Sequence, residues 1–295
     1  MNSKLCLGTA QFGLDYGITN KNGKVQNQEV DLIFKRAYEK NILFFDTANA
    51  YGNSEKIIGE KLEGKDVKII TKFSANNYDL YSKENILLLD KEFKKSLKKV
   101  KRNSIDAYLL HDPNDLKKEN SKLLLNWLKE LKNKKYIKRF GVSIYDESDL
   151  KNLPLEDLQI IQLPISIYDQ RLLNYSLIDK LLKLGISIHI RSIFLQGLLL
   201  QKSSNWPRKI NPEFRNHHIK YEKAIKESDL NLLESTIAFI KELDFAELVL
   251  FGITNLEELN SFIRCWESQK TILKKINFSN FKWEVVNDID PRKWN

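Results

Sequence analysis

The sequence is poor in the residues that mark disulfide-stapled, fibrous or linker-rich proteins. Its 295 residues include 2 cysteines, 11 glycines and 6 prolines. Two thiols as far apart in sequence as Cys6 and Cys265 do not suggest a disulfide framework, and free thiols fit a reducing compartment. Scarce glycine and proline exclude a collagen-like chain and argue against long flexible linkers. A single domain over residues 1–295 is expected.

Long hydrophobic runs are also missing. Runs such as LVLF at 248–251 are far too short to span a bilayer. The opening MNSKLCLGTAQFGLDYG lacks the apolar stretch of a secretory signal. We therefore expect a cytoplasmic protein without a membrane partner.

Histidine is scarce as well, and its spacing does not fit a metal site. No HExxH motif and no cysteine–histidine cluster occurs, so no metal site is expected. His217 and His218 are predicted to lie in an exposed loop. His189 is predicted to lie inside a strand, where it can face the core.

Charge of one sign dominates, with a net charge of +9 and a pI near 9.2. The densest basic run is KEFKKSLKKVKR at 91–102. The apolar residues in and before it recur at steps of three and four and predict one helical stripe: Ile86, Leu89, Phe93, Leu97 and Val100. The lysines fall mostly off that stripe, as on the solvated face of an amphipathic helix. No aromatic-rich or helix-turn-helix pattern accompanies them, so no nucleic-acid partner is expected.

Short apolar runs alternate with helical patterns along the chain. Val30, Ile33, Phe34, Ala37 and Tyr38 have the spacing of a one-sided helix. The eight predicted strands are Leu5–Leu7, Ile42–Phe45, Val67–Ile70, Ile105–Leu110, Ile137–Val142, Leu158–Leu163, Ile186–Ile190 and Leu248–Phe251. Strands that alternate with helices form a parallel sheet, and eight units in this length favour a closed (β/α)₈ TIM barrel.

Three segments interrupt this pattern. Residues 10–28 and 192–228 are predicted to be long loops after the first and seventh strands, where such loops are usually functional. Both would emerge at the carboxyl-terminal face, which carries the active sites of barrels. The tail at 276–295 is expected either to fold over that face or to pack on the barrel wall.

Polar residues at successive strand ends suggest a catalytic set. Asp46, Lys72 and His111 end the second, third and fourth strands, and Tyr51 follows Asp46 by five residues. Carbonyl reduction needs a hydride donor and a proton for the oxygen. A tyrosine can supply that proton, and a nearby ammonium lowers its pKa. A carboxylate would neutralise the lysine, and a histidine could orient the carbonyl.

Taken singly, each of the four residues has a structural explanation. Asp46 could cap a helix, Lys72 could be an ordinary strand-end lysine, Tyr51 could fill a loop, and His111 could complete a turn before Asp112. Only their joint placement favours chemistry.

Several segments resemble the aldo-keto reductases. FFDTANAYGNSEKIIGEKL at 44–62 resembles the catalytic segment of that family. ITKF at 70–73 and DAYLLHDP at 106–113 are similar to the segments with its lysine and histidine. GVSIYD at 141–146 is similar to the cofactor segment after the fifth strand, and GTAQFG at 8–13 is similar to the loop at the end of the first strand. The resemblance covers almost the whole chain, in order.

This resemblance implies roles. Tyr51 would be the general acid, tuned by Lys72 and Asp46, with His111 positioning the substrate. Ser143 and Gln162 would hold the nicotinamide carboxamide. The remaining implied cofactor residues are Gly8, Thr9, Asp46, Arg191, Gly252, Thr254 and Asn255, the last three at the adenosine phosphate end. There the opening of the last helix would offer free N–H groups to phosphate.

Departures from the family pattern concern the cofactor. Ile144 replaces a common asparagine. Arg191 stands where an aromatic residue stacks on the nicotinamide ring, a role that a guanidinium can also fill. Glu257 and Glu258 occupy the segment that often holds a basic or neutral polar residue against the 2′-phosphate of NADPH. Ser261 and Phe262 replace a pair that commonly contacts adenine. Family habit implies NADP, with NAD left open.

The leading hypothesis is an NAD(P)H-dependent reductase of an aldehyde, ketone or sugar carbonyl. One alternative is a non-catalytic, cofactor-binding regulatory subunit of the same family. Another is a barrel hydrolase or lyase with Asp46 and Asp112 as paired carboxylates, which leaves Tyr51 and Lys72 unexplained. The expected partner is a small carbonyl compound, with sugar derivatives among the candidates. Asp15, Tyr16 and Arg191 could contact its hydroxyl groups.

Overall fold

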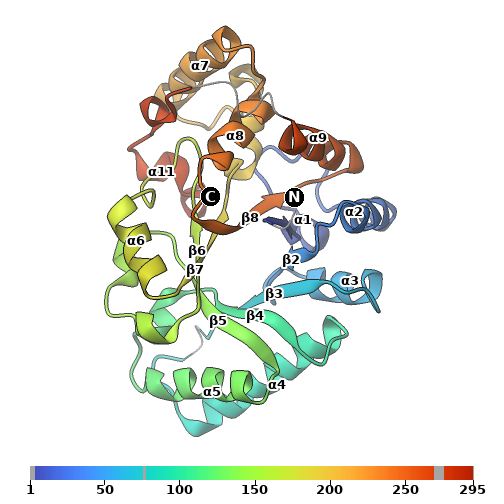
Figure 1. Ribbon diagram of the computed structural model, residues 1–295, viewed down its shortest axis with the longest axis vertical. Coiled ribbons are helices and arrows are strands. Elements are labelled where there is room, and N and C mark those ends of the chain that lie inside the picture. Colours follow the sequence, from blue (N-terminus) through green and yellow to red (C-terminus); the bar gives the residue numbers. More distant parts are fainter. Residues whose placement is uncertain (1–3, 76–77, 269–275, 295) are drawn as a thin grey trace.

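A computed structural model describes residues 4–75, 78–268 and 276–294. Eight parallel strands close into a barrel in sequence order, with helices outside (Figure 1). The strands are β1 (Leu5–Gly8), β2 (Phe44–Asp46), β3 (Lys68–Phe73), β4 (Ile105–Leu110), β5 (Ile137–Ser143), β6 (Ile160–Pro164), β7 (Ser187–Arg191) and β8 (Ala246–Gly252). The predicted (β/α)₈ barrel is confirmed.

The two faces of the strands alternate, as the pleat requires. One face fills the barrel interior with a small apolar cluster that includes Cys6, Phe44, Ile70, Leu109 and Leu250. The other face packs against the helices and forms most of the hydrophobic core. Several strands run one to three residues past the apolar runs that predicted them, because their last positions carry polar residues or glycine.

The outer helices follow the predicted apolar stripes. The longer ones are α2 (Asn27–Glu39), α3 (Ser54–Lys61), α4 (Lys83–Lys99), α5 (Ser121–Asn133), α6 (Tyr175–Lys183), α7 (Pro212–Glu227), α8 (Leu232–Lys241) and α9 (Leu256–Glu267). Helix α4 begins with a capping box between Ser82 and Asn85, and it buries Leu89, Phe93 and Leu97. Its lysines face outward, as predicted. No helix of the described residues has both the length and the apolar character needed to cross a membrane.

The two predicted long loops contain regular structure, so that part of the prediction was wrong. The segment 10–28 opens with the short helix α1 (Ala10–Gly13), and α2 begins at Asn27. The segment 192–228 holds two 3₁₀ turns, η4 (Leu195–Leu200) and η5 (Ser203–Asn205), and then α7. Helix α7 has few aliphatic residues. The side chains that it buries are mainly aromatic or histidine: Phe214, His218 and Tyr221, with Ile225.

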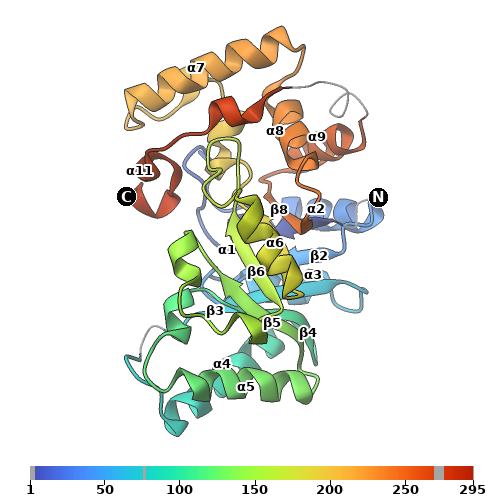
Figure 2. The same cartoon turned by 60° about the vertical axis from the view of Figure 1, so that its left-hand side comes forward.

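Helix α7 and the tail pack together at one end of the molecule (Figure 2). His217 and His218 lie on α7 rather than in an exposed loop, and His218 is fully buried against Trp206 and Tyr168. The tail holds η6 (Phe278–Phe281), α11 (Val286–Ile289) and η7 (Pro291–Lys293). The backbone N–H of Trp283 donates to the Tyr168 carbonyl at 3.0 Å. The tail thus packs against segments that follow β6 and β7 at the carboxyl-terminal face of the barrel. Asn295, within its predicted range, lies outside the described residues.

Candidate active site

Strand alternation places the predicted site residues on the inner face of the barrel at its carboxyl-terminal mouth. Each stands two positions after a residue of the barrel interior: Asp46 follows Phe44, and Lys72 follows Ile70. By the same step, His111 follows Leu109. All eight positions line one cavity of about 1740 Å³: Gly8, Asp46, Lys72, His111, Ser143, Gln162, Arg191 and Gly252.

A buried ion pair lies at the centre of this ring. Lys72 Nζ donates to Asp46 Oδ1 and, at 2.9 Å, to the Thr47 carbonyl. The two charged side chains are 1% and 5% exposed. Gln162 Nε2 donates to Asp46 Oδ2 at 2.9 Å, so both carboxylate oxygens are engaged. Asp46 is therefore not a helix cap, and Lys72 is not an ordinary strand-end lysine.

Tyr51 and His111 lie beside this pair. The Lys72 ammonium stands 5.2 Å from the centre of the Tyr51 ring, and the rings of Tyr51 and His111 are 6.0 Å apart. Burial, and then the Asp46 carboxylate, raise the pKa of Tyr51. Burial, then Lys72 and Arg191, lower the pKa of His111 to about 3. At neutral pH the site thus presents a protonated phenol and a neutral imidazole.

A close approach of two backbone segments positions Tyr51. A Cβ atom on Gly13 would lie 1.9 Å from the Tyr51 carbonyl oxygen and 2.8 Å from the Ser54 nitrogen. Only glycine permits this contact between α1 and the loop that holds Tyr51.

We expect Gly13→Ala to push the Tyr51 loop outward. A displacement of about 1 Å can cost a hundredfold in rate, so turnover should fall by about that factor while the enzyme stays folded. The control is Gly64→Ala: a Cβ there meets nothing within 4 Å, although its φ of +70° adds backbone strain. Steady-state kinetics and thermal unfolding compare the two, and unchanged turnover in Gly13→Ala would contradict this role.

Thr9 supports the site from behind. Its hydroxyl donates to the Asp46 carbonyl at 2.8 Å and lies 2.7 Å from the Ser54 hydroxyl. Ser54 also donates to the Thr9 carbonyl at 2.9 Å. The Thr9 side chain is therefore engaged inside the protein, and Gly8 and Thr9 line the cavity.

Gln162 carries an unsatisfied acceptor. It is fully buried, and its Oε1 has no hydrogen-bond partner among the described residues. Because buried polar atoms are normally paired, this oxygen is available to a ligand amide. A carboxamide such as that of nicotinamide fits it. The Ser143 hydroxyl, expected at the same group, accepts a bond from Arg191 Nε at 3.2 Å.

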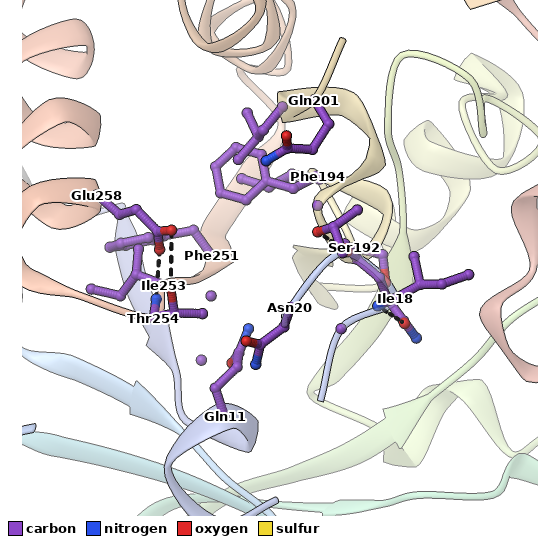
Figure 3. A pocket seen from close by; sticks show the side chains of 18 of the residues that line it. Gln11, Ile18, Asn20, Ser192, Phe194, Gln201, Phe251, Ile253, Thr254 and Glu258 are labelled. Carbon is purple, nitrogen blue, oxygen red and sulfur yellow. Dashed lines mark hydrogen bonds between the residues drawn. The ribbon is translucent and has the colours of Figure 1, made fainter. Parts of the chain in front are cut away.

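The opening of α9 differs from the expected phosphate site. The Thr254 N–H donates to Glu258 Oε2 at 2.6 Å, and the Thr254 hydroxyl donates to Glu258 Oε1 at 2.9 Å (Figure 3). Asn255 caps the helix by accepting from the Glu258 N–H. The Leu256 N–H donates to Glu29 of α2. The expected free N–H groups are thus engaged at these three positions, and two carboxylates stand beside them.

Sequence reasoning did not assign roles to some residues around the cavity. Gln196 accepts from the Ile18 N–H at 3.1 Å, and its carbonyl accepts from the Thr19 hydroxyl at 3.1 Å. These bonds join the β1 loop to the segment after β7. Gln196 has a φ of +52°, and the residues around it in the sequence do not predict this left-handed backbone conformation. Tyr145 packs against Arg191, with 4.0 Å between the guanidinium carbon and the ring centre.

His189 and Asp112, which the sequence analysis also considered, make contacts within the fold. His189 is fully buried in β7, with Nε2 3.6 Å from Glu247 Oε2. Asp112 accepts the Asn114 N–H at 2.9 Å and caps η1 (Pro113–Leu116). It is not paired with Asp46, which removes the geometric basis for a two-carboxylate hydrolase. Within the described ranges, no group of three or more metal-ligand side chains lies close enough to hold an ion.

Known proteins share this architecture. The aldo-keto reductase YhdN of Bacillus subtilis (strain 168) is 26% identical over 237 residues, which are 75% of this chain and 67% of that protein. The holo form of the aldo-keto reductase AKR11C1 from Bacillus halodurans has a TM-score of 0.68 at 20% identity, over 90% of this chain and 87% of that one. The glycerol dehydrogenase AKR11B4 from Gluconobacter oxydans has a TM-score of 0.67 at 17% identity, over 98% and 92%.

The sequence match to the family extends across the barrel. The model of the Aldo/keto reductase family matches residues 4–277, which include every strand and the four residues Asp46, Tyr51, Lys72 and His111. The chain therefore belongs to the aldo/keto reductase family of oxidoreductases.

Proposed function

We propose that this protein reduces the carbonyl group of a small molecule to an alcohol with a nicotinamide cofactor. The observation that carries the proposal is the grouping of Tyr51, His111 and the buried Asp46–Lys72 pair in one cavity. When bound, the nicotinamide supplies the hydride. The protein's own residues bind the carbonyl, exclude water and provide the proton.

Each of the four residues has a distinct task in this mechanism. Tyr51 holds its proton at neutral pH and delivers it to the carbonyl oxygen as negative charge develops there. The Lys72 ammonium, over the Tyr51 ring, stabilises the phenolate that remains. Asp46 fixes Lys72 in place. Neutral His111 orients the carbonyl oxygen by a hydrogen bond and adds no charge.

Gln162 and Ser143 line the place for the nicotinamide carboxamide. The unpaired Oε1 of Gln162 accepts an amide N–H there, and its Nε2 remains on Asp46. Gln162 would thus contact both the cofactor and the Asp46–Lys72 pair.

We infer that the preferred cofactor is NAD rather than the NADP expected from family habit. The support is the α9 opening, where Glu258 and Glu29 hold the N–H groups of Thr254 and Leu256. A 2′-phosphate there would face two carboxylates in place of free donors. A ribose 2′-hydroxyl carries no charge and can instead donate to a carboxylate.

We expect the wild-type protein to bind NADH about tenfold more tightly than NADPH, because a repulsion of about 1.4 kcal/mol gives that ratio. Glu258→Gln keeps the size of the side chain and removes its charge, so it should strengthen NADPH binding and narrow the ratio. Fluorescence titration with both cofactors measures it.

The matched control is Glu60→Gln, which removes one carboxylate from the outer face of α3. It should leave both affinities unchanged. Tighter binding of NADPH than NADH by the wild-type protein would contradict the NAD assignment and leave the reductase proposal standing.

Turnover separates a reductase from a cofactor-binding regulatory subunit. We propose a screen of aldehydes, ketones and aldoses in which cofactor oxidation is followed by absorbance. Sugar derivatives belong in the panel, because a structurally similar protein is a glycerol dehydrogenase. Cofactor binding without any turnover across the panel would favour the regulatory alternative.

A further inference from the structure

Arg191 ends β7 and reaches the catalytic end of the cavity with three of its donors engaged. Its Nε donates to the Ser143 hydroxyl at 3.2 Å, one terminal nitrogen donates to the Ser192 hydroxyl at 3.2 Å, and the other to the Ile144 carbonyl at 2.9 Å. All three acceptors are uncharged. A guanidinium has five N–H groups, so two remain for a ligand.

Among the residues that the structure describes, no carboxylate pairs with this cation. In residues 4–75, 78–268 and 276–294, Arg191 makes no ion pair. Acidic groups of neighbouring segments pair with other cations: Asp46 with Lys72, Asp290 with Arg292, and Asp146 with Arg171. Arg191 is partly buried, and a charge removed from water without a counter-charge is costly. An anionic ligand would supply the missing charge.

The groups packed around Arg191 do not cancel its charge. Tyr145 separates two guanidinium groups, with Arg191 at 4.0 Å from its ring centre and Arg292 of the tail at 3.6 Å. The other cavity residues near the catalytic end, Tyr16, Tyr51 and His111, are neutral at pH 7. Arg191 lines the same cavity as His111 and helps to lower its pKa.

This charge fits an anionic substrate better than the ring-stacking role that sequence reasoning gave Arg191. The nicotinamide ring becomes positively charged when it gives up hydride. A guanidinium stacked on the ring would oppose that change. A carboxylate on the substrate would instead be held by the two remaining N–H groups, in the paired geometry that arginine favours.

We propose that the substrate is an oxo acid, an aldehyde or ketone that carries a carboxylate, and that Arg191 binds this carboxylate. The proposal rests on the reductase function proposed above and names its substrate class. In the reaction the carbonyl carbon accepts the hydride, the π electrons move to oxygen, and the oxygen takes the Tyr51 proton. The product is the hydroxy acid, the cofactor is oxidised, and the carboxylate is unchanged.

The test compares pairs of substrates in which a carboxylate of one member is replaced by a hydroxymethyl group in the other. Suitable pairs are glyoxylate with glycolaldehyde, pyruvate with hydroxyacetone, and glucuronate with glucose. In the wild-type enzyme we expect kcat/KM to favour the acid of at least one pair by about 10- to 100-fold, the range of a hydrogen-bonded charge pair. Arg191→Gln should lower kcat/KM for the acid, mainly through KM, by a much larger factor than for the neutral member, and so remove the preference.

Two further variants control for fold and for general charge. Arg191→Lys keeps the positive charge but lacks the paired N–H groups of the guanidinium, so it should retain part of the preference for the acid. Lys180→Gln removes one exposed cation from α6 and should change nothing. NADH affinity, measured by fluorescence, should be the same in all four proteins. If Arg191→Gln instead lost NADH affinity and its kcat/KM fell equally for both members of each pair, Arg191 would be a cofactor-binding residue and the proposal would be overturned.

Binding of an unreactive acid gives a readout independent of turnover. Calorimetric titration of the NADH complex with oxamate should show binding in the wild type and none in Arg191→Gln, and the neutral analogue oxamide should not bind. Absence of oxamate binding together with equal use of acids and neutral carbonyls would refute the oxo-acid proposal while the reductase function stands. Oxamate binding without reduction of any carbonyl would instead defeat the reductase function alone.

Discussion

Tyr51→Phe is expected to lower kcat for carbonyl reduction by about 10²- to 10⁴-fold, the usual contribution of a general acid. The phenyl ring keeps the packing against His111 and Lys72 and loses only the proton. Because that proton is needed only as charge develops on the carbonyl oxygen, NADH affinity should stay within about twofold. Single-turnover kinetics and fluorescence titration measure the two quantities.

A matched control is Tyr175→Phe, which removes a phenol hydroxyl from a side chain that is 76% exposed on α6. It should retain wild-type kinetics. Full activity in Tyr51→Phe would refute the assigned role, and a parallel loss of NADH affinity would show that the hydroxyl serves cofactor binding instead.

The same electrostatics predict how the rate depends on pH. The pKa of Tyr51 is raised by burial, so the phenol stays protonated through neutral pH and into the alkaline range. The pKa of His111 is lowered to about 3, so its imidazole does not titrate in the usual histidine range of about pH 5 to 8. The kcat for reduction should therefore be flat across that range. A step near pH 6.5 that disappears in His111→Gln would contradict the neutral assignment.

The barrel and its central residues were predictable because one periodicity controls both. A strand that alternates apolar side chains between two faces places its next inward residue at the barrel mouth. Phe44 and Ile70 thus locate Asp46 and Lys72 without any knowledge of the coordinates. The apolar signal stops at these positions, which is why the predicted strands ended early. Polar residues at strand ends thus help to predict functional residues, but they predict the exact end of a strand poorly.

Other features depend on contacts between distant segments, and the sequence does not record these. Glu29 lies on α2, yet it accepts the N–H of Leu256 at the start of α9. A helix opening with Glu257 and Glu258 suggests repulsion of phosphate, but not that its donors are already taken. Likewise the sequence predicts a loop where α7 lies, because this segment has few apolar residues. It buries His218 against Trp206, a contact that hydrophobic periodicity does not detect.

The Asp46–Lys72 pair allows stability and catalysis to be separated. Lys72→Met leaves a buried carboxylate without its cation, and such a loss costs about 3–5 kcal/mol of unfolding free energy. Asp46→Asn leaves the buried ammonium unpaired with a comparable effect. Replacing both at once removes both charges, so the double variant should recover much of the stability. Denaturant unfolding of the four proteins measures the coupling, and Lys183→Met in the exposed α6 pair with Asp179 is the control that should change little.

Activity should not recover with stability in the double variant. Without the ammonium beside its ring, the Tyr51 phenolate left after proton transfer loses a stabilising cation. We expect kcat for reduction to fall by about 10²-fold or more in Lys72→Met and to stay low in the double variant. Alcohol oxidation, which needs Tyr51 to accept a proton from the alcohol, should require a higher pH in Lys72→Met, because burial and the Asp46 carboxylate still disfavour the phenolate and the Lys72 cation is gone. If the stable double variant regained wild-type reduction, the ion pair would serve only the fold, and Tyr51 would need no charged neighbour for catalysis.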